Sequence, residues 1–295
     1  MIPFRALLGT IRPVDIDPAY LPFLFFIAAL LYSSVGHAGA SGYLAAMALA
    51  GMAPDMMKPA ALCMNVVVAT LTTFRFYQAG FFSFALLWPF AATAVPLAYV
   101  GGLVPASIPL FKPIVGVVLW IAAIRLMMND RNGGARRSER ETDRTDHGSA
   151  GVAARTPAPA DHTAVARTPR LPLALLVGAA IGFLSGLTGT GGGIFLSPIL
   201  ILAGWANPRV AGGVSAAFIL LNSISGLGGV ATAGFRVPDE LPLWVAVVFI
   251  GALAGTQLGT RQLAPLWLKR LLGVVLLIAG FKFVYPVVVG ALRGA

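Results

Sequence analysis

The chain has 295 residues, of which 58% are hydrophobic and only 11% are charged, and its formal net charge is +10. A soluble domain carries roughly 25% charged residues, and the acidic residues here fall outside the long apolar runs, so the composition excludes an ordinary soluble protein and indicates a membrane protein. The positive charge does not indicate nucleic-acid binding, because Lys and Arg gather at segment ends and in one linker, as the positive-inside rule expects.

The first half of the chain contains one interrupted apolar segment and three continuous ones. After an N-terminal segment, residues 1–19, an apolar run over 21–36 is broken by G-H-A-G-A-S-G at residues 36–42 and resumes over 43–53. A cleaved signal peptide is not expected, because the first apolar run follows Asp15 and Asp17 and leads into further spans. The continuous segments lie at about 59–82, 83–111 and 113–128.

A polar tract over residues 129–171 separates the two halves. It is rich in Arg, acidic residues, Gly and Pro and has few large apolar residues, so it is predicted to be a disordered basic linker. The second half, residues 172–295, also opens with an interrupted segment, whose break reads S-G-L-T-G-T-G-G-G over residues 185–193. Its continuous apolar segments lie at about 210–235, 241–260 and 271–292.

The two halves resemble each other in sequence, which predicts an internal duplication. Ala79-Gly80-Phe81 matches Ala233-Gly234-Phe235, and G-V-V-L occurs both at 116–119 and at 273–276. In the breaks, Gly39 and Leu44 match Gly191 and Leu196. We therefore expect a first membrane repeat over 20–128 and a second over 172–295.

Each break is predicted to form a hairpin. An interior Gly costs a helix about 1 kcal/mol relative to Ala, and half-helices of ~12–16 residues reach only ~18–24 Å across a ~30 Å hydrocarbon core. Hairpins invert the halves and place Arg75, Arg209 and the Arg261/Lys269/Arg270 cluster on the linker side, with Lys58, Lys112 and Arg236 as exceptions on the other side. The predicted fold is an all-α polytopic membrane protein with two homologous four-segment repeats, inverted, each opening with a glycine-broken helical hairpin.

The two breaks are also candidates for an anion site. Helix ends that face a break expose backbone N–H groups, which bind anionic oxygens in transporters. The alternative is that the small residues only allow close helix packing. The candidate substrate-binding residues come from the breaks and from polar positions on apolar helices: His37, Gly39, Ser41, Gly42, Asn65, Thr188, Thr190, Gly191, Gly192, Gly193, Ser215, Asn222 and Ser225.

Several of these residues have a purely structural alternative. His37 could be a packed, hydrogen-bonded residue or a proton-sensitive contact to the anion, since imidazole titrates near pH 6.5. Polar residues on membrane helices often only bond a neighbouring helix, for about 0.6 kcal/mol. Asn222 and Ser225 are three residues apart, so we expect them to share a helix face.

The sequence favours a transporter over an enzyme. A hydrolase built on His37 and a nearby Ser would lack a specific match, and no metal site or cofactor is expected, because Cys63 is the single cysteine. No span contains a carboxylate, so a carboxylate coupling site is not expected, and an anion leaving a negative interior gains about 2.3 kcal/mol per charge at 100 mV. Export could run as a uniport, unless His37 shuttles a proton. The alternatives are an anion channel and a non-transporting scaffold.

With these motifs the chain resembles the sulfite exporter TauE/SafE family of membrane permeases. The resemblance covers about 20–128 and 172–290 and is carried by residues 36–42, 185–193 and 220–226 (L-L-N-S-I-S-G). The first break departs from the family pattern, with His37, Ala38 and Ala40 where glycines are usual. The resemblance implies export of sulfite, an organosulfonate or another sulfur-containing anion across a bacterial inner membrane. Both the identity of the anion and the formation of a homodimer stay open.

Overall fold

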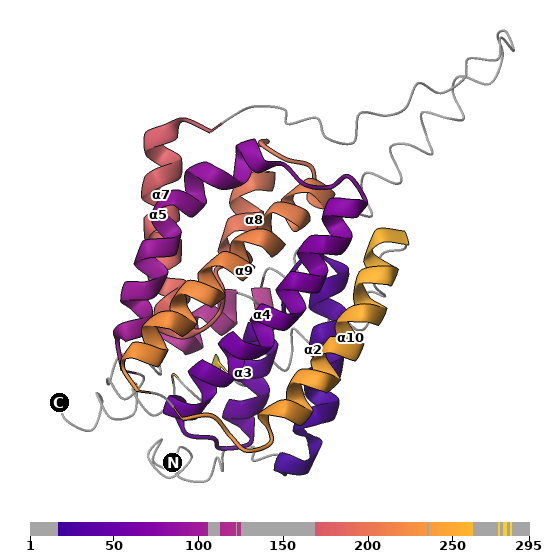
Figure 1. The fold of residues 1–295 in the computed structure, drawn as a ribbon, viewed down its shortest axis with the longest axis vertical. Helices are drawn as coiled ribbons and strands as arrows, with labels where there is room; N and C mark the ends of the chain where they lie inside the picture. The colour runs from indigo at the N-terminus through magenta and orange to yellow at the C-terminus, as the bar shows by residue number, and fades with distance from the viewer. Residues whose placement is uncertain are drawn as a thin grey trace, which may run out of the picture.

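The computed structural model describes residues 17–105, 113–124 without 122, 169–261 without 235, and residues 277, 280, 281 and 284 (Figure 1). The predicted linker is outside the described residues up to residue 168, as are Lys112, Arg125 and most of 271–292. The described part contains helices and no strand. Its elements are η1 Pro18–Tyr20, α2 Leu21–Ser34, α3 Ala40–Leu49, α4 Pro54–Gln78, α5 Phe84–Leu103, α7 Leu171–Thr188, α8 Gly193–Leu202, α9 Pro208–Thr232 and α10 Leu241–Arg261.

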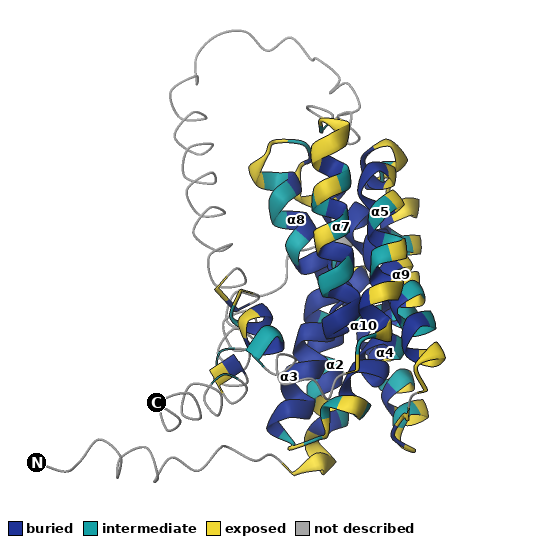
Figure 2. Cartoon of the chain, turned by 90° about the vertical axis from the view of Figure 1, so that its left-hand side faces the viewer, coloured by how far each residue is buried: buried dark blue, intermediate teal, exposed yellow. Residues whose placement is uncertain are grey.

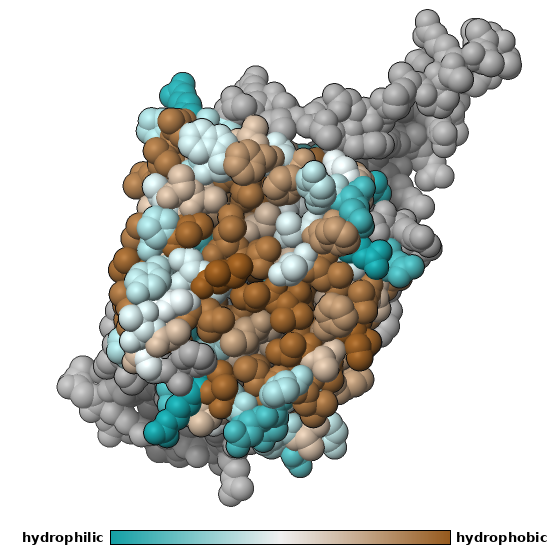
Figure 3. Space-filling view, in the orientation of Figure 1, coloured by the Kyte–Doolittle hydropathy of each residue, from teal (hydrophilic) through white to brown (hydrophobic). Residues whose placement is uncertain are grey.

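Five of the described helices are long and apolar enough to cross a bilayer, namely α4, α5, α7, α9 and α10. The helices α4 and α9 have 25 residues each, which corresponds to about 38 Å at 1.5 Å per residue. Large apolar side chains such as Leu176 and Ile250 are exposed on the outer surface. Apolar residues cover the middle of the face in Figure 3, and polar residues lie toward its two ends. The prediction of an all-α, multi-pass membrane protein is confirmed.

Proline marks the start of several helices. Pro22, Pro54, Pro172 and Pro208 occupy the first or second position of α2, α4, α7 and α9, where the missing N–H has no intrahelical partner to lose. The start of α4 corrects the predicted boundary at 59: the helix begins at Pro54, and Pro59 lies inside it. The exposed Asp55 and the buried Lys58 therefore belong to the helix.

The prediction of a duplication gains support from backbone conformation. Four glycine pairs adopt positive φ at matching places: Gly36 and Gly189, Gly39 and Gly192, Gly51 and Gly204, and Gly80 and Gly234. Gly39 and Gly192 are both N-caps, of α3 and α8. This corrects the predicted alignment of the breaks by one residue, since the partner of Gly39 is Gly192 rather than Gly191. The backbone, rather than sequence identity, fixes the alignment there.

One helix of each half packs against the first hairpin helix of the other half through glycines. A Cβ added at Gly178, Gly182 or Gly186 of α7 would meet the backbone oxygen of Phe90, Ala94 or Ala98 of α5, in the same order along both helices. Likewise Gly251, Gly255 and Gly259 of α10 lie against the backbone of Phe26, Leu30 and Ser34 of α2. Both pairs are therefore parallel. Small residues four apart are how membrane helices bring their backbones close together.

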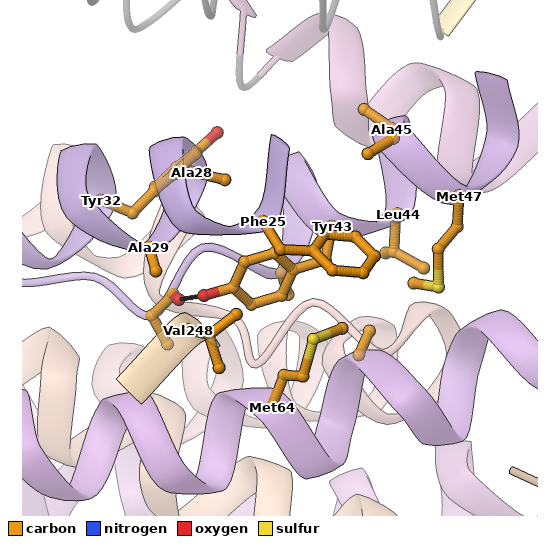
Figure 4. Close-up of a cluster of buried hydrophobic side chains, with 14 of the residues drawn as sticks. Phe25, Ala28, Ala29, Tyr32, Tyr43, Leu44, Ala45, Met47, Met64 and Val248 are labelled. Carbon is orange, nitrogen blue, oxygen red and sulfur yellow. Dashed lines mark hydrogen bonds between the residues drawn. The ribbon is translucent and has the colours of Figure 1, made fainter. Parts of the chain in front are cut away.

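Each hydrophobic core accordingly combines elements of both halves. One core joins α2, α3 and α4 to α10 and also contains Ile194 of α8, Ile219 of α9 and residues 115, 119 and 123, whereas the second joins α7, α8 and α9 to α5. In the first core, the Phe25 ring packs edge-on against Tyr43 of α3, with centroids 5.6 Å apart (Figure 4). It also packs edge-on against Trp244 of α10, at 5.1 Å. The buried Tyr43 hydroxyl donates to Ala38 O at 2.6 Å.

The short helices α3 and α8 return toward the end where their hairpins begin. Pro18 and Leu21 at the start of α2 line a pocket of about 810 Å³ together with Met52 and Met56 at the junction of α3 and α4. In the other half, the Trp205 ring after α8 lies near the Phe90 ring, with centroids 6.1 Å apart, and the Phe90 backbone lies against Gly178 in the first half of α7. The two short helices consequently lie toward opposite ends of the molecule (Figure 2).

The central helices α4 and α9 cross in opposite directions. Phe76 near the end of α4 contacts Gly212 near the start of α9, whereas Leu62 near the start of α4 lies close to Gly226 far along α9. Their midpoints meet beside the second break.

Candidate functional site

The second break presents backbone donors inside the protein. It runs from Gly189 to Gly192 between α7 and α8, and Gly189, Gly191 and Gly192 all have positive φ, which side-chain-bearing residues rarely adopt. Within the described part of the chain, the N–H groups of Thr190, Gly191 and Gly192 make no hydrogen bond. No side chain caps α8 either. These N–H groups therefore need a partner at membrane depth.

Unpaired side chains from three helices surround this break. The amides of Asn65 on α4 and Asn222 on α9, and the hydroxyls of Ser223 on α9 and Ser185 on α7, are buried without a hydrogen-bonding partner among the described residues. A Cβ added at Gly191 would lie 2.9 Å from Asn65 Nδ2 and 3.1 Å from Ser223 Oγ. A Cβ at Gly192 would lie 3.3 Å from Ser185 Cβ. We name Asn65, Ser185, Gly191 and Ser223 the amide cluster; Asn222 precedes Ser223 in α9 and is likewise buried without a partner.

The amide cluster is closed from solvent. The side chains of Asn65, Ser185, Asn222 and Ser223 are each 0% exposed. An unpaired buried polar group costs about 1–3 kcal/mol, so a cluster of them is a substantial and unusual burden on stability. A small ligand with several acceptor oxygens would satisfy the amide, hydroxyl and backbone donors together.

The first break is built differently, because its histidine reaches into the second half. His37 Nε2 lies 2.8 Å from Ser197 Oγ and 3.1 Å from the carbonyl oxygen of Gly193, both on α8. Ser197 Oγ in turn lies 2.7 Å from Ser215 Oγ on α9. Gly36 packs against the backbone of Gly212. The first break is thus tied to α8 and α9 by hydrogen bonds.

The remaining predicted site residues fall into separate places. Ser41 Oγ donates to the Tyr32 hydroxyl at 2.6 Å, and Thr188 and Thr190 share a hydrogen bond of 2.9 Å. Gly39 packs against the ring of Tyr43 in the first break, and Gly42 is buried in α3. Of the predicted residues, the structure therefore brings Asn65 and Gly191 into the amide cluster, with Thr190, Gly192 and Gly193 beside it, and buries Asn222 next to Ser223 in α9.

The Ser225 hydroxyl has a partner outside the amide cluster. Its hydroxyl donates to Val95 O of α5, at 2.5 Å, whereas Asn222 is fully buried without a partner. Three residues correspond to only 300° of rotation, so the two side chains diverge by about 60° around the helix axis. Ser223, one residue along, faces Gly191 instead.

Sequence reasoning missed Lys58 and Ser197. Lys58 is only 2% exposed, and its Nζ donates to the carbonyl oxygens of Gly101, Gly102 and Val104 at 3.1, 2.9 and 2.9 Å. The lysine thereby caps the C-terminal end of α5, while its backbone and stem lie against Gly189 of the second break. It was expected at the membrane surface, as an exception to the charge rule. A helical spacing of four residues from Gly193 was the available signal for Ser197.

Among the described residues, no group of three or more His, Cys, Asp or Glu side chains could hold a metal ion. The amide cluster offers hydrogen-bond donors to a ligand, together with the unpaired acceptor oxygen Oδ1 of Asn65.

The fold and the polar groups beside the second break define a class: a multi-pass helical membrane protein with a cluster of unpaired, buried polar groups next to a helix break. Comparison with known proteins narrows this class. The family model described as sulfite exporter TauE/SafE matches residues 21–283. The probable membrane transporter protein y4hK of Sinorhizobium fredii (strain NBRC 101917 / NGR234) is 34% identical over 272 residues, which cover 92% of this chain and 100% of that relative. No solved structure matches the chain.

The chain belongs to the sulfite exporter TauE/SafE family and is a membrane transporter. The family prediction made from the two glycine breaks is confirmed.

Proposed function

We propose that this protein exports a small sulfur-containing anion, such as sulfite or an organosulfonate, across the bacterial inner membrane. The family description supports the substrate class, since it names sulfite export. One observation carries the location of the site: the unpaired N–H groups of Thr190, Gly191 and Gly192 converge with the unpaired amide of Asn65 and hydroxyl of Ser223. Sulfite and sulfonate groups carry three oxygens, which accept hydrogen bonds from several directions at once.

The two membrane repeats, 20–128 and 172–295, are inverted relative to each other in this proposal. The opposite directions of the equivalent helices α4 and α9 support it, as do the two hairpins that return to opposite ends. Asp17, Asp55, Asp239 and Glu240 lie at the end that holds the start of α2, whereas Arg75, Arg170 and Arg209 lie at the other. By the positive-inside rule the Arg-rich end is cytoplasmic. In this orientation the Arg-rich linker predicted over 129–171 is expected on the cytoplasmic side.

Transport then proceeds by alternating access. The amide cluster is enclosed, so the anion must enter and leave by movement of one repeat against the other. The closed site favours a transporter over an anion channel, whose pathway would need continuous access. A non-transporting scaffold would have no use for unpaired buried donors, and it would not be stabilised by an anion. An enzyme is disfavoured because the amide cluster contains no pair of a nucleophile and a base.

Thermal unfolding of the purified protein with a panel of anions tests the proposal. The panel contains sulfite, thiosulfate, sulfate, taurine, sulfoacetate, acetate and chloride at matched ionic strength. An anion at 100 times its dissociation constant stabilises the folded state by about 2.7 kcal/mol, which raises the melting temperature by several degrees. We expect this with a sulfur-containing anion and not with acetate or chloride.

Two variants of α4 then place the site. In Asn65→Leu the anion response should disappear, while the melting temperature without anion stays equal or rises, because an unpaired buried amide is removed. Thr70→Val is the matched control, since the Thr70 hydroxyl bonds Val66 O on the exposed side of the same helix. An unchanged anion response in Asn65→Leu would refute the site. No response of the unmodified protein to any anion would favour the scaffold.

A further inference from the structure

The side chain of His37 is the polar bridge between the first break and the helix that follows the second. It comes from the loop between α2 and α3, and its Nε2 contacts Gly193 O and Ser197 Oγ of α8. Gly193 directly follows Gly191 and Gly192, whose N–H groups belong to the proposed anion site. The imidazole ring therefore contacts the residue that directly follows the proposed anion-binding N–H groups.

Both ring nitrogens of His37 face oxygen acceptors. Nδ1 lies 3.3 Å from Val35 O, and Nε2 lies 3.1 Å from Gly193 O. Ser197 has one hydroxyl proton, which it donates to Gly193 O at 3.0 Å, so its oxygen accepts from Nε2. Donation from Nδ1 and Nε2 at the same time requires the protonated imidazolium, whereas a neutral ring with its proton on Nε2 keeps the contacts with α8 and loses donation to Val35 O.

A neutral His37 loses one of these two donations. If Nε2 loses its proton, the Ser197 hydroxyl must turn from Gly193 O to Nε2, and Gly193 O faces a ring lone pair. If Nδ1 loses its proton instead, it faces Val35 O without a donor. Among its ring contacts, Tyr32 from α2 is titratable and packs edge-on with centroids 6.5 Å apart, whereas Ser197 and Ser215 from α8 and α9 do not titrate near neutral pH. The buried Lys58 directs its ammonium to three carbonyl oxygens of α5.

We propose that His37 binds a proton together with the anion, so that the protein moves one proton with each anion. The inference rests on the proposed anion site. The imidazolium lies next to Gly193, so its positive charge is about 7–10 Å from an anion at Gly191, counting at most about 3.5 Å per residue. At an effective dielectric constant of about 20, this attraction strengthens anion binding roughly 15- to 50-fold. By linkage, the anion strengthens proton binding by the same factor.

Proton coupling changes the energetics from those of a uniport. With one proton the transported unit carries one negative charge fewer, so the membrane potential drives it by about 2.3 kcal/mol less at 100 mV. A monoanion would move without net charge. Because no described span contains a buried carboxylate, His37 takes the place that Asp or Glu holds in many proton-coupled transporters.

The experiment measures anion affinity at pH 5.5 and pH 8.5 with thiosulfate and sulfoacetate, whose charges are constant over this range. The full-length protein should bind its anion at least 10-fold more tightly at pH 5.5. In His37→Gln, which keeps a donor for Ser197 but does not titrate, the affinity should be the same at both pH values. Equal affinities in the unmodified protein, or an undiminished pH effect in His37→Gln, would overturn the inference and leave the proposed anion site standing.

A second measurement does not depend on the variant folding. Calorimetric titration of the unmodified protein near pH 7, in two buffers with different heats of ionisation, counts protons taken up with the anion. We expect uptake of up to one proton per anion, and a count of zero from pH 5.5 to 8.5 would overturn the inference. Absence of binding by both anions at every pH would instead refute the proposed sulfur-anion function, and this inference with it.

Discussion

The substitution Gly191→Ala tests whether the second break is the anion site. Gly191 has φ +76°, where a residue with a side chain costs about 1–2 kcal/mol relative to Gly. The new Cβ would lie 2.6 Å from Ile219 Cγ2 and 2.9 Å from Asn65 Nδ2. Overpacking of this kind costs about 1–3 kcal/mol more. We expect a total destabilisation of roughly 2–5 kcal/mol, and a methyl group in the space where the anion oxygens would bind.

Gly51→Ala is the matched control. Gly51 has φ +75°, and nothing lies within 4 Å of its added Cβ, so this variant has the backbone strain without the clash. Thermal unfolding should show a loss of about 1–2 kcal/mol for Gly51→Ala, with a normal stabilisation by the anion. Gly191→Ala should unfold at a lower temperature and gain nothing from the anion. Equal melting temperatures of the two variants, or a full anion response in Gly191→Ala, would refute the reasoning.

Two further predictions concern the scaffold around the site. Gly186→Ala should destabilise the protein by at least about 1–3 kcal/mol, because the new Cβ would clash with the backbone of Ala98. The control Gly228→Ala, whose Cβ would meet only Tyr99 ring atoms at 3.7 and 3.8 Å, should be neutral or stabilise by up to about 1 kcal/mol. Equal unfolding temperatures of the two variants would contradict the close contact between α5 and α7. Lys58→Met should cost about 1.5–3 kcal/mol through loss of charged hydrogen bonds to α5, measured by thermal unfolding, and an unchanged melting temperature would show that the cap contributes little.

The sequence predicted the class of fold and the family because both depend on local patterns. Long apolar runs indicated the spans, and the glycine clusters marked the hairpins between α2 and α3 and between α7 and α8. Gly80 and Gly234, matched in sequence, also share their positive φ. The sequence alignment of the two breaks was wrong by one residue, because several neighbouring glycines match Gly39 equally well. The backbone identifies Gly192 as its partner, since both residues are helix N-caps.

The cluster of residues beside the second break was predicted in part, since its assembly depends on which helices meet. Asn65 and Asn222 stood out as amides on apolar helices, and the structure buries both without partners. Lys58 could not be foreseen as a buried cap, because its three acceptors lie on α5 and are exposed only where that helix ends at Leu103. Ser225 was expected to line the site with Asn222, but its hydroxyl donates to Val95 O of α5.

The exchange of α5 and α10 between the two cores has a consequence for synthesis of the chain in the cell. The helix α2 packs along α10, which begins about 200 residues later, so at 5–20 residues per second it waits roughly 10–40 s for its partner. With 14 residues, α2 is only about 21 Å long, shorter than a ~30 Å hydrocarbon core. During this interval the first hairpin lies in the bilayer with one flank uncovered. We therefore expect the first half alone to be degraded or held by insertion factors, and to become stable when the second half is produced beside it.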